Sequence, residues 1–212
     1  TVHYEAPPSS QVPEEMKQFI TWYSSFKTNA EELKQLLIKT SLSHLYFESI
    51  HPFEDGNGRV GRALAEKCLS EFFGRPLFAS LSTVIEKDKK AYYNHLKNAQ
   101  RSLEVSDWIF YFSNVITDGI TETKNLIRWT VEKMKFLDKN RGEMNDRQVK
   151  AVLKMLDAGT AGFEGGMTSR KYISINKTSR ATATRDLQEL VVKNILKQLG
   201  EGRSVRYQLN FV

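Results

Sequence analysis

The spacing of hydrophobic residues predicts a helical first part of the chain. Apolar side chains recur every three or four positions, which is the pattern of helices with one buried face. Pro13 followed by two glutamates is a typical helix start, and Gly74-Arg75-Pro76 is a typical stop. Helices are expected from Pro13 to Phe26, from near Ala30 to Phe47, from Val60 to Phe72, over 87–102 and over 106–139, the last one broken or bent.

A different pattern begins after a short polar segment at 141–145. Three short helices are expected at 146–156, 168–173 and 179–192. Two segments of alternating polarity then flank Gly200-Glu201-Gly202, which is typical of a β-hairpin. Three helices and a hairpin, with a basic third helix, predict a winged helix-turn-helix. The chain is therefore expected to divide into a helical domain at 1–140 and a winged helix-turn-helix domain at 145–212.

Composition and charge agree with two folded parts that have different partners. The chain has 212 residues, of which 40% are hydrophobic and 26% charged, proportions that exclude disordered and low-complexity classes. Its 31 basic and 25 acidic residues give a net charge of +6. Up to Met144 the sequence contains 19 of each, and beyond it 12 basic and 6 acidic residues. The second part is therefore expected to bind something acidic.

The sequence also bears on the compartment. No apolar run approaches the roughly 18 residues that a membrane span needs, and no basic-then-apolar leader is visible. The single cysteine, Cys68, cannot form an internal disulfide. A cytoplasmic protein without a membrane partner is expected.

The segment 51–62 contains the residues best suited to bind phosphates. Gly56 and Gly58 flank Asn57 directly before a helix, where backbone N–H groups and the helix N-terminus together form an anion site. Arg59 and Arg62 lie three residues apart on the first helical turn, and two guanidinium groups suit a polyphosphate.

Two further residues of this segment add reactive groups. Asp55 is a hard oxygen ligand that could hold Mg²⁺ against phosphates, and His51 is a proton acceptor near neutral pH. Taken singly, such residues more often form a simple turn, a structural histidine or a solvated arginine. Their combination within twelve residues predicts the transfer of a phosphorus-centred group to a hydroxyl.

The segment resembles the motif of the Fic family, His-Pro-Phe-x-Asp/Glu-Gly-Asn-Gly-Arg-x-x-Arg, at every specified position. His44–Ile50 before the motif and Tyr4–Val12 are also similar to that family, so the resemblance covers about 1–140. It implies a mainly α protein: a helical Fic-fold catalytic domain with a short flap strand, of which the first strand is expected to be missing or trimmed. Val2-His3-Tyr4 is expected to be a short extended segment. The tail more loosely resembles the winged helix-turn-helix domain that follows some bacterial Fic domains.

The resemblance implies a protein adenylyltransferase, which moves AMP from Mg-ATP to a Ser, Thr or Tyr hydroxyl and releases pyrophosphate. His51 is then the general base, Asp55 the Mg²⁺ ligand, and the Asn57 side chain lies near the α-phosphate. Arg59 neutralises the phosphates, Arg62 holds the γ-phosphate, and Phe53 anchors the loop in the core. The implied catalytic residues are His51, Asn57 and Arg59. The motif residues implied in nucleotide binding are Glu54, Asp55, Gly56, Asn57, Gly58, Arg59, Gly61 and Arg62, with no catalytic role for Glu54.

The helix after the motif lines the adenine cleft in that family. Ala91–Gln100 resembles it, so Tyr92 or Tyr93 is expected to pack on the base and Gln100 to hydrogen-bond to it. The alternative is that these tyrosines belong to the core or to an interface. A further match, Thr160–Gly165, to the family's inhibitory pattern Ser/Thr-x-x-x-Glu-Gly/Asn lies in a Gly-rich loop, and we interpret it as chance.

The basic tail is expected to contact DNA, with protein docking as the alternative. The expected DNA-binding residues are Lys177, Arg180, Thr182, Thr184, Arg185, Arg203 and Arg206. Two other functions stay open: a DNA-binding regulator whose Fic unit senses nucleotide, and a Fic enzyme that removes AMP or transfers another phosphate-containing group. The expected partners are ATP, a hydroxyl-bearing target protein, which could be the chain itself, DNA, and a second copy in a homodimer.

Overall fold

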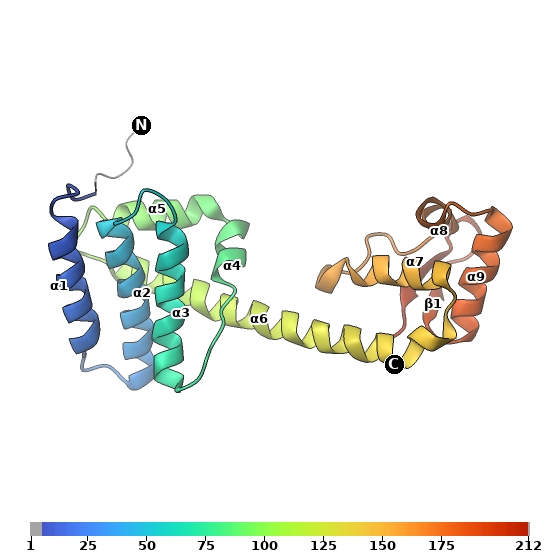
Figure 1. Cartoon of the computed structure of the whole chain (residues 1–212), viewed down its shortest axis with the longest axis horizontal. Helices are drawn as coiled ribbons and strands as arrows, with labels where there is room; N and C mark the ends of the chain where they lie inside the picture. The colour runs from blue at the N-terminus through green and yellow to red at the C-terminus, as the bar shows by residue number, and fades with distance from the viewer. Residues whose placement is uncertain (1–5, 212) are drawn as a thin grey trace. The chain divides into compact units, whose positions relative to one another are not determined.

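Helices form most of this computed structural model, which confirms a mainly α chain and adds a small antiparallel sheet (Figure 1). The structure describes residues 6–211, so the expected extended segment at Val2-His3-Tyr4 lies outside the described residues. The chain packs into two compact units, which we call unit 1 (Thr1–Lys124) and unit 2 (Asn125–Val212).

Unit 1 contains five complete helices and the first part of a sixth. Local signals set several ends: α1 has Pro13 and two glutamates in its first turn, and α3 begins and ends at the left-handed glycines Gly56 and Gly74. The helices are α1 (Val12–Ser25), α2 (Glu32–Ile50), α3 (Asn57–Phe73), α4 (Leu81–Lys87), α5 (Lys89–Ala99) and α6 (Ser106–Asn140).

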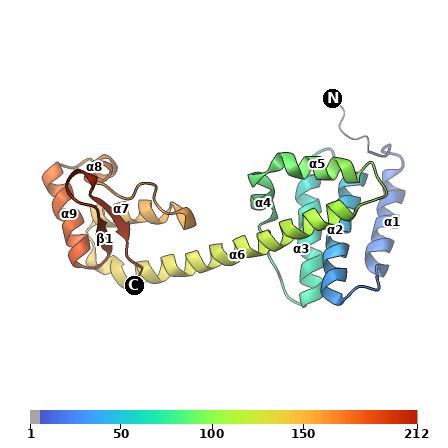
Figure 2. The same cartoon turned by 180° about the vertical axis from the view of Figure 1, so that it is seen from behind.

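The core of unit 1 lies where α2 and α3 meet the first part of α6, which crosses them (Figure 2). Trp108 of α6 is fully buried there, and its Nε1–H donates a hydrogen bond of 2.8 Å to the Ser41 carbonyl of α2. Phe112 and Ile116 extend this buried face of α6. A second cluster of Phe19, Phe47 and Ile50 packs α1 against α2.

The long helix α6 is continuous, whereas the sequence predicted a break or bend. Its one glycine, Gly119, packs instead of kinking the helix. A Cβ there would lie 3.1 Å from Leu81 Cδ2, so the glycine allows a close approach to the start of α4. The compact units divide within α6, between Lys124 and Asn125, whereas the sequence placed a linker at 141–145. The last part of α6 supplies Phe136, Trp129 and Leu137 to the core of unit 2.

Unit 2 has the expected order of three helices and a hairpin. The polar residues Asn145, Thr168 and Ser179 cap the three helices by accepting hydrogen bonds from backbone N–H groups. The strands pair antiparallel, with Leu196 opposite Leu209 and with Gly200 in the turn. The elements are α7 (Asp146–Leu156), α8 (Ser169–Asn176), α9 (Arg180–Val192), β1 (Leu196–Leu199) and β2 (Arg206–Leu209). Their assignment to a winged helix-turn-helix stays a prediction.

An ion pair with a buried carboxylate connects the helices of unit 2. Asp186 of α9 is almost fully buried and accepts two hydrogen bonds from the Arg147 guanidinium, at 2.8 and 3.2 Å. The Tyr172 hydroxyl of α8 donates a third, at 2.9 Å. Burial alone would raise the pKa of Asp186, but these hydrogen bonds hold it below its ordinary value. One carboxylate therefore links α7, α8 and α9.

No helix within residues 6–211 combines the length and the apolar character that a membrane crossing requires.

Candidate functional site

His51 marks the point where the chain leaves α2. It has φ 50° and ψ 56°, a left-handed conformation that is uncommon outside glycine, and its N–H donates to the Phe47 carbonyl at 3.0 Å. The side chain is exposed. The imidazole is therefore open to the hydroxyl of a large partner as well as to a small molecule.

Asn57 closes the loop between α2 and α3. Its Oδ1 accepts from the Phe53 N–H at 3.0 Å and its Nδ2 donates to the Phe53 carbonyl at 2.6 Å, while the residue is 3% exposed. Each end of this amide thus makes one hydrogen bond within the loop, and the position of the side chain near the α-phosphate stays a prediction. The prediction that Phe53 anchors the loop through a core side chain is wrong, because the residue is 50% exposed. Its backbone, held by Asn57, fixes the loop.

Two arginines converge on two glycines at the start of α3. A Cβ on Gly56 would lie 3.1 Å from Arg59 Nη2, and a Cβ on Gly58 would lie 3.1 Å from Arg62 Nη1. Each guanidinium therefore lies directly over a glycine. At the start of α3 the Arg59 and Val60 N–H groups both donate to the Gly56 carbonyl at 3.0 Å, whereas the N–H groups of Asn57 and Gly58 precede the first intrahelical acceptor. With φ 89°, Gly56 also adopts a turn that other residues rarely adopt. The loop thus brings two cations and backbone donors to one place, where an anion can bind.

Asp55 is the acidic group of this loop nearest to the arginines. Its Oδ2 lies 3.2 Å from Arg59 Nη2, and its side chain is 94% exposed. The described residues contain no group of three or more His, Cys, Asp or Glu side chains that could hold a metal by themselves. A single exposed carboxylate still fits Mg²⁺, which proteins often bind through one or two carboxylates together with substrate phosphates.

Gly61 lies above a buried polar layer between α2 and α3, which sequence reasoning missed. A Cβ at Gly61 would be 2.5 Å from Glu48 Oε1 and 2.9 Å from His44 Nδ1. Both side chains are buried, and neither of these two atoms has a hydrogen-bond partner within the described chain. Gly61, expected among the nucleotide-binding residues, therefore allows the close approach of the two helices. The signal in the sequence was a histidine and a glutamate four residues apart on a largely apolar helix.

Burial favours the neutral form of both groups in this layer. It lowers the pKa of His44 to about 4. It also raises the pKa of Glu48 to about 7, against the opposing effect of the Arg62 guanidinium. The His44 ring packs against Phe112 and Trp108, with centroid distances of 4.5 and 6.0 Å, and these two rings also stack on each other at 5.0 Å. An apolar setting thus surrounds two ionisable groups directly beneath the first turn of α3.

The residues expected to bind adenine separate into buried and exposed positions. Tyr92 is 3% exposed, and its hydroxyl lies 2.8 Å from His44 Nε2, so it belongs to the core and to the buried layer. Tyr93 is 61% exposed. Gln100 Nε2 donates to the Glu48 carbonyl at 3.3 Å. Of the two tyrosines, Tyr93 is therefore the one whose ring a ligand can reach without displacing the core.

The residues expected to bind DNA lie on α9, in the segment before it, on β2 and between the two strands. Arg180 and Arg185 are exposed on α9, and Lys177 is exposed directly before it. The Thr182 hydroxyl contacts Ser179 Oγ, and the Thr184 hydroxyl donates to the backbone. Arg206 is exposed on β2, and the side chain of Arg203 lies outside the described part.

Known proteins are similar to this chain over different shares of its length. Residues 1–69 match the Fic/DOC family. A protein from Aquifex aeolicus (strain VF5), described as a probable protein adenylyltransferase, is 30% identical over 121 residues, which cover 57% of this chain and 34% of that protein. The chain thus spans about a third of the length of this relative. A crystal structure of a Fic family protein from Desulfovibrio desulfuricans G20 aligns with 96% of this chain and 56% of that chain, at 21% identity and a TM-score of 0.46.

Proposed function

We propose that unit 1 is a Fic-type protein adenylyltransferase, which transfers AMP from Mg-ATP to a Ser, Thr or Tyr hydroxyl of a target protein. The observation that carries the proposal is the packing of the Arg59 and Arg62 guanidinium groups over Gly56 and Gly58, at the N-terminus of α3. This arrangement suits a polyphosphate, and the exposed His51 imidazole lies at the other end of the same loop. The family match of residues 1–69 and the description of the Aquifex relative support the same activity.

The reaction requires one proton transfer and one displacement at phosphorus. His51 accepts the proton of the target hydroxyl as its oxygen attacks the α-phosphorus. The bond from that phosphorus to the bridging oxygen breaks, and pyrophosphate leaves. Arg59 and Arg62, with the N–H groups of α3, stabilise the negative charge on the phosphates. Asp55 would hold Mg²⁺, which neutralises phosphate charge when bound.

Asn57 has a positioning role in this proposal. Its two hydrogen bonds to the Phe53 backbone keep the loop in one conformation, so the base and the anion site stay in a fixed relation. Tyr93 is the proposed adenine contact on α5, because its ring is exposed. The buried layer of His44 and Glu48 supports the same helix turn from below.

The first test compares His51→Ala with His95→Ala, a matched control that removes another imidazole of unit 1. His95 stacks on Tyr111, with ring centroids 4.1 Å apart. Each variant is incubated with Mg²⁺, cell lysate and ATP labelled at the α-phosphate, and modified proteins are identified by mass spectrometry. His51→Ala is expected to lower transfer by at least about 100-fold while ATP affinity changes by less than about twofold, because the base acts on the target hydroxyl. His95→Ala is expected to retain transfer.

Undiminished adenylylation by His51→Ala, including self-modification, would contradict the assignment. Loss of label from a pre-modified target would favour AMP removal. A nucleotide bound but never turned over by the wild type would favour the sensor alternative.

A further inference from the structure

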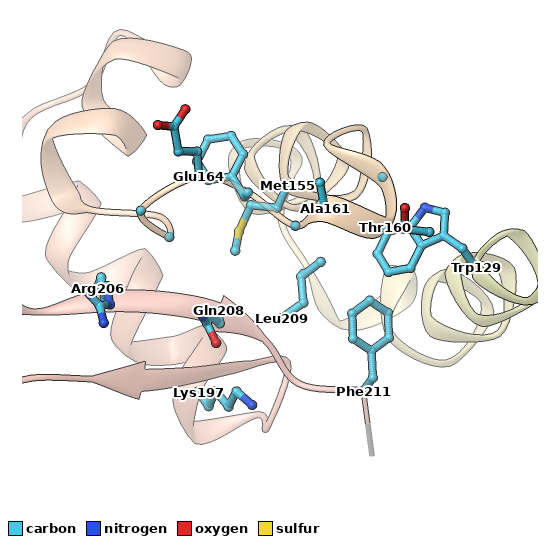
Figure 3. Close-up of a pocket in the computed structure, with 15 residues that line it drawn as sticks. Trp129, Met155, Thr160, Ala161, Glu164, Lys197, Arg206, Gln208, Leu209 and Phe211 are labelled. Atoms are coloured by element: carbon cyan, nitrogen blue, oxygen red, sulfur yellow. The ribbon is translucent and has the colours of Figure 1, made fainter. Parts of the chain in front are cut away.

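A cavity of about 650 Å³ lies in unit 2, between the Gly-rich loop 159–166 and the two strands (Figure 3). This volume is within the range of sites that hold small molecules, about 300–1,000 Å³. The loop is the segment whose match to an inhibitory pattern we interpreted as chance. The loop forms one wall of this cavity. The ligand site inferred here does not depend on the transferase activity proposed for unit 1.

The loop wall of the cavity is fixed in place by contacts at its end. Met167 and Tyr207 exchange two backbone hydrogen bonds, of 2.8 and 2.7 Å, which join the end of the loop to β2. A Cβ on Gly166, which has φ 68°, would lie 3.0 Å from the Tyr207 carbonyl oxygen. The Lys171 ammonium donates to the carbonyls of Glu164 and Gly166. The cavity therefore has a defined wall, as a preformed binding site requires.

One end of the cavity is apolar and aromatic. The rings of Trp129 and Phe211 meet edge to face, with centroids 5.3 Å apart, and Phe136 supports Phe211 at 5.2 Å. Met155 and Leu209 continue the apolar lining. Figure 3 shows this aromatic pair on one side of the cavity and Arg206 on the other. A planar ring can pack at the aromatic end with little loss of conformational entropy.

The strands bring two uncompensated cations to the cavity. Lys197 of β1 lies opposite Gln208 of β2, and Arg206 precedes Gln208 by two residues, so all three share one face of the hairpin. Within residues 6–211, neither Lys197 nor Arg206 forms an ion pair. Glu164 is the acidic residue of the lining, and Figure 3 shows its carboxylate directed away from the strands. The cavity is therefore complementary to a negative charge.

We propose that this cavity binds a small aromatic anion. The ring lies against Trp129 and Phe211, and the acidic group receives charge-assisted hydrogen bonds from Arg206 and Lys197. An aromatic carboxylate and a nucleotide share this chemistry, since each joins a planar ring to an anionic group. The test below separates these two sources.

The test uses the full chain and two fluorescent probes of similar shape. One is the anion 8-anilinonaphthalene-1-sulfonate, and the other is the neutral N-phenyl-1-naphthylamine. The anion is expected to bind saturably at one site, at least about tenfold more tightly than the neutral probe. Arg206→Gln and Lys197→Gln are each expected to weaken the anion about tenfold and the neutral probe less than twofold. Lys150→Gln, an exposed lysine of α7 outside the lining, is the matched control and should change neither.

A second pair of variants tests the place of binding. Phe211→Ala is expected to weaken both probes, because the aromatic end is lost. Ala161→Trp, on the exposed part of the loop, is expected to abolish binding of both by filling the cavity. Competition by 2-naphthoate would identify an aromatic carboxylate as the natural class, and competition by AMP a nucleotide. Unsaturable binding, equal affinity for the two probes, or unchanged anion affinity in Arg206→Gln would each overturn the proposal.

Discussion

Replacing Glu48 by glutamine is expected to make the free energy of unfolding of unit 1 increase with pH between about pH 4.5 and 6.5. In the wild type, the effects of Glu48 and His44 on this free energy cancel over that range. In the folded chain the pKa of Glu48 is about 7, against an ordinary value of 4.5. Between these values the folded chain binds a proton that the unfolded chain has lost. The stabilising contribution of this carboxyl is therefore fully present below pH 4.5 and disappears as the pH rises through 7.

His44 has the opposite effect over almost the same range. Its pKa is about 4 in the folded chain, against 6.5 ordinarily, so between these values the unfolded chain binds the extra proton. The contribution of His44 is present above pH 6.5 and is lost as the pH falls through 4. In the wild type the two slopes, one proton each with opposite sign, cancel between about pH 4.5 and 6.5.

Glu48→Gln removes one of the two slopes. The free energy of unfolding of the variant, minus that of the wild type, should then rise by at most about 1.4 kcal/mol per pH unit, and by about 2 kcal/mol from pH 4.5 to 6.5, because titration is only partial near each pKa. The measurement is urea unfolding at pH 4.5, 5.5 and 6.5 in a Trp129→Phe background, so that the two remaining tryptophans, Trp22 and Trp108, both report on unit 1. Glu54→Gln, which removes an exposed carboxyl, is the control. A difference that stays constant or falls with rising pH would refute the reasoning.

Three further outcomes are expected. Gly61→Ala should lower the free energy of unfolding of unit 1 by about 1–3 kcal/mol, because the methyl group would lie 2.5 Å from Glu48 Oε1. Gly142→Ala is the control: its methyl group would meet nothing within 4 Å, so the thermal transition should stay unchanged. Arg147→Ala should destabilise unit 2 by about 1–3 kcal/mol, because buried Asp186 loses two hydrogen bonds, with hydrogen exchange of unit 1 as the unaffected reference. Random duplex DNA should bind the full chain with an affinity that falls steeply with salt in fluorescence anisotropy; no binding at low ionic strength would favour protein docking.

The sequence predicted those features that depend on residues close together in the chain. The end of α3 at Gly74 and the hairpin around Gly200 appear as expected, and α3 begins at Asn57, three residues before the expected Val60. Each follows from local backbone geometry, because a glycine with positive φ or an alternating strand pattern acts within a few residues. The grouping of two arginines over the loop follows in the same way from their spacing on one helical turn.

The features that sequence reasoning missed depend on which helix faces meet. His44 and Glu48 become a buried layer only because Gly61 lets α3 approach α2, and Tyr92 belongs to that layer because α5 packs there. Such choices are decided by tertiary packing, which a pattern of residue types along one segment does not specify.

The continuity of α6 limits how the two units can be separated or exchanged. Residues 124–128 in its middle are all exposed and helical, so the boundary between the compact units falls within one helix. A chain cut at Asn140 would keep Phe136 and Trp129 without the partners that cover them, and such bare apolar side chains promote association. A cut near Lys124 would leave both cores complete. A chimeric protein that combines unit 1 with another domain, in evolution or in the laboratory, must therefore be joined within a helix. The two helix segments must then match in helical phase at the junction.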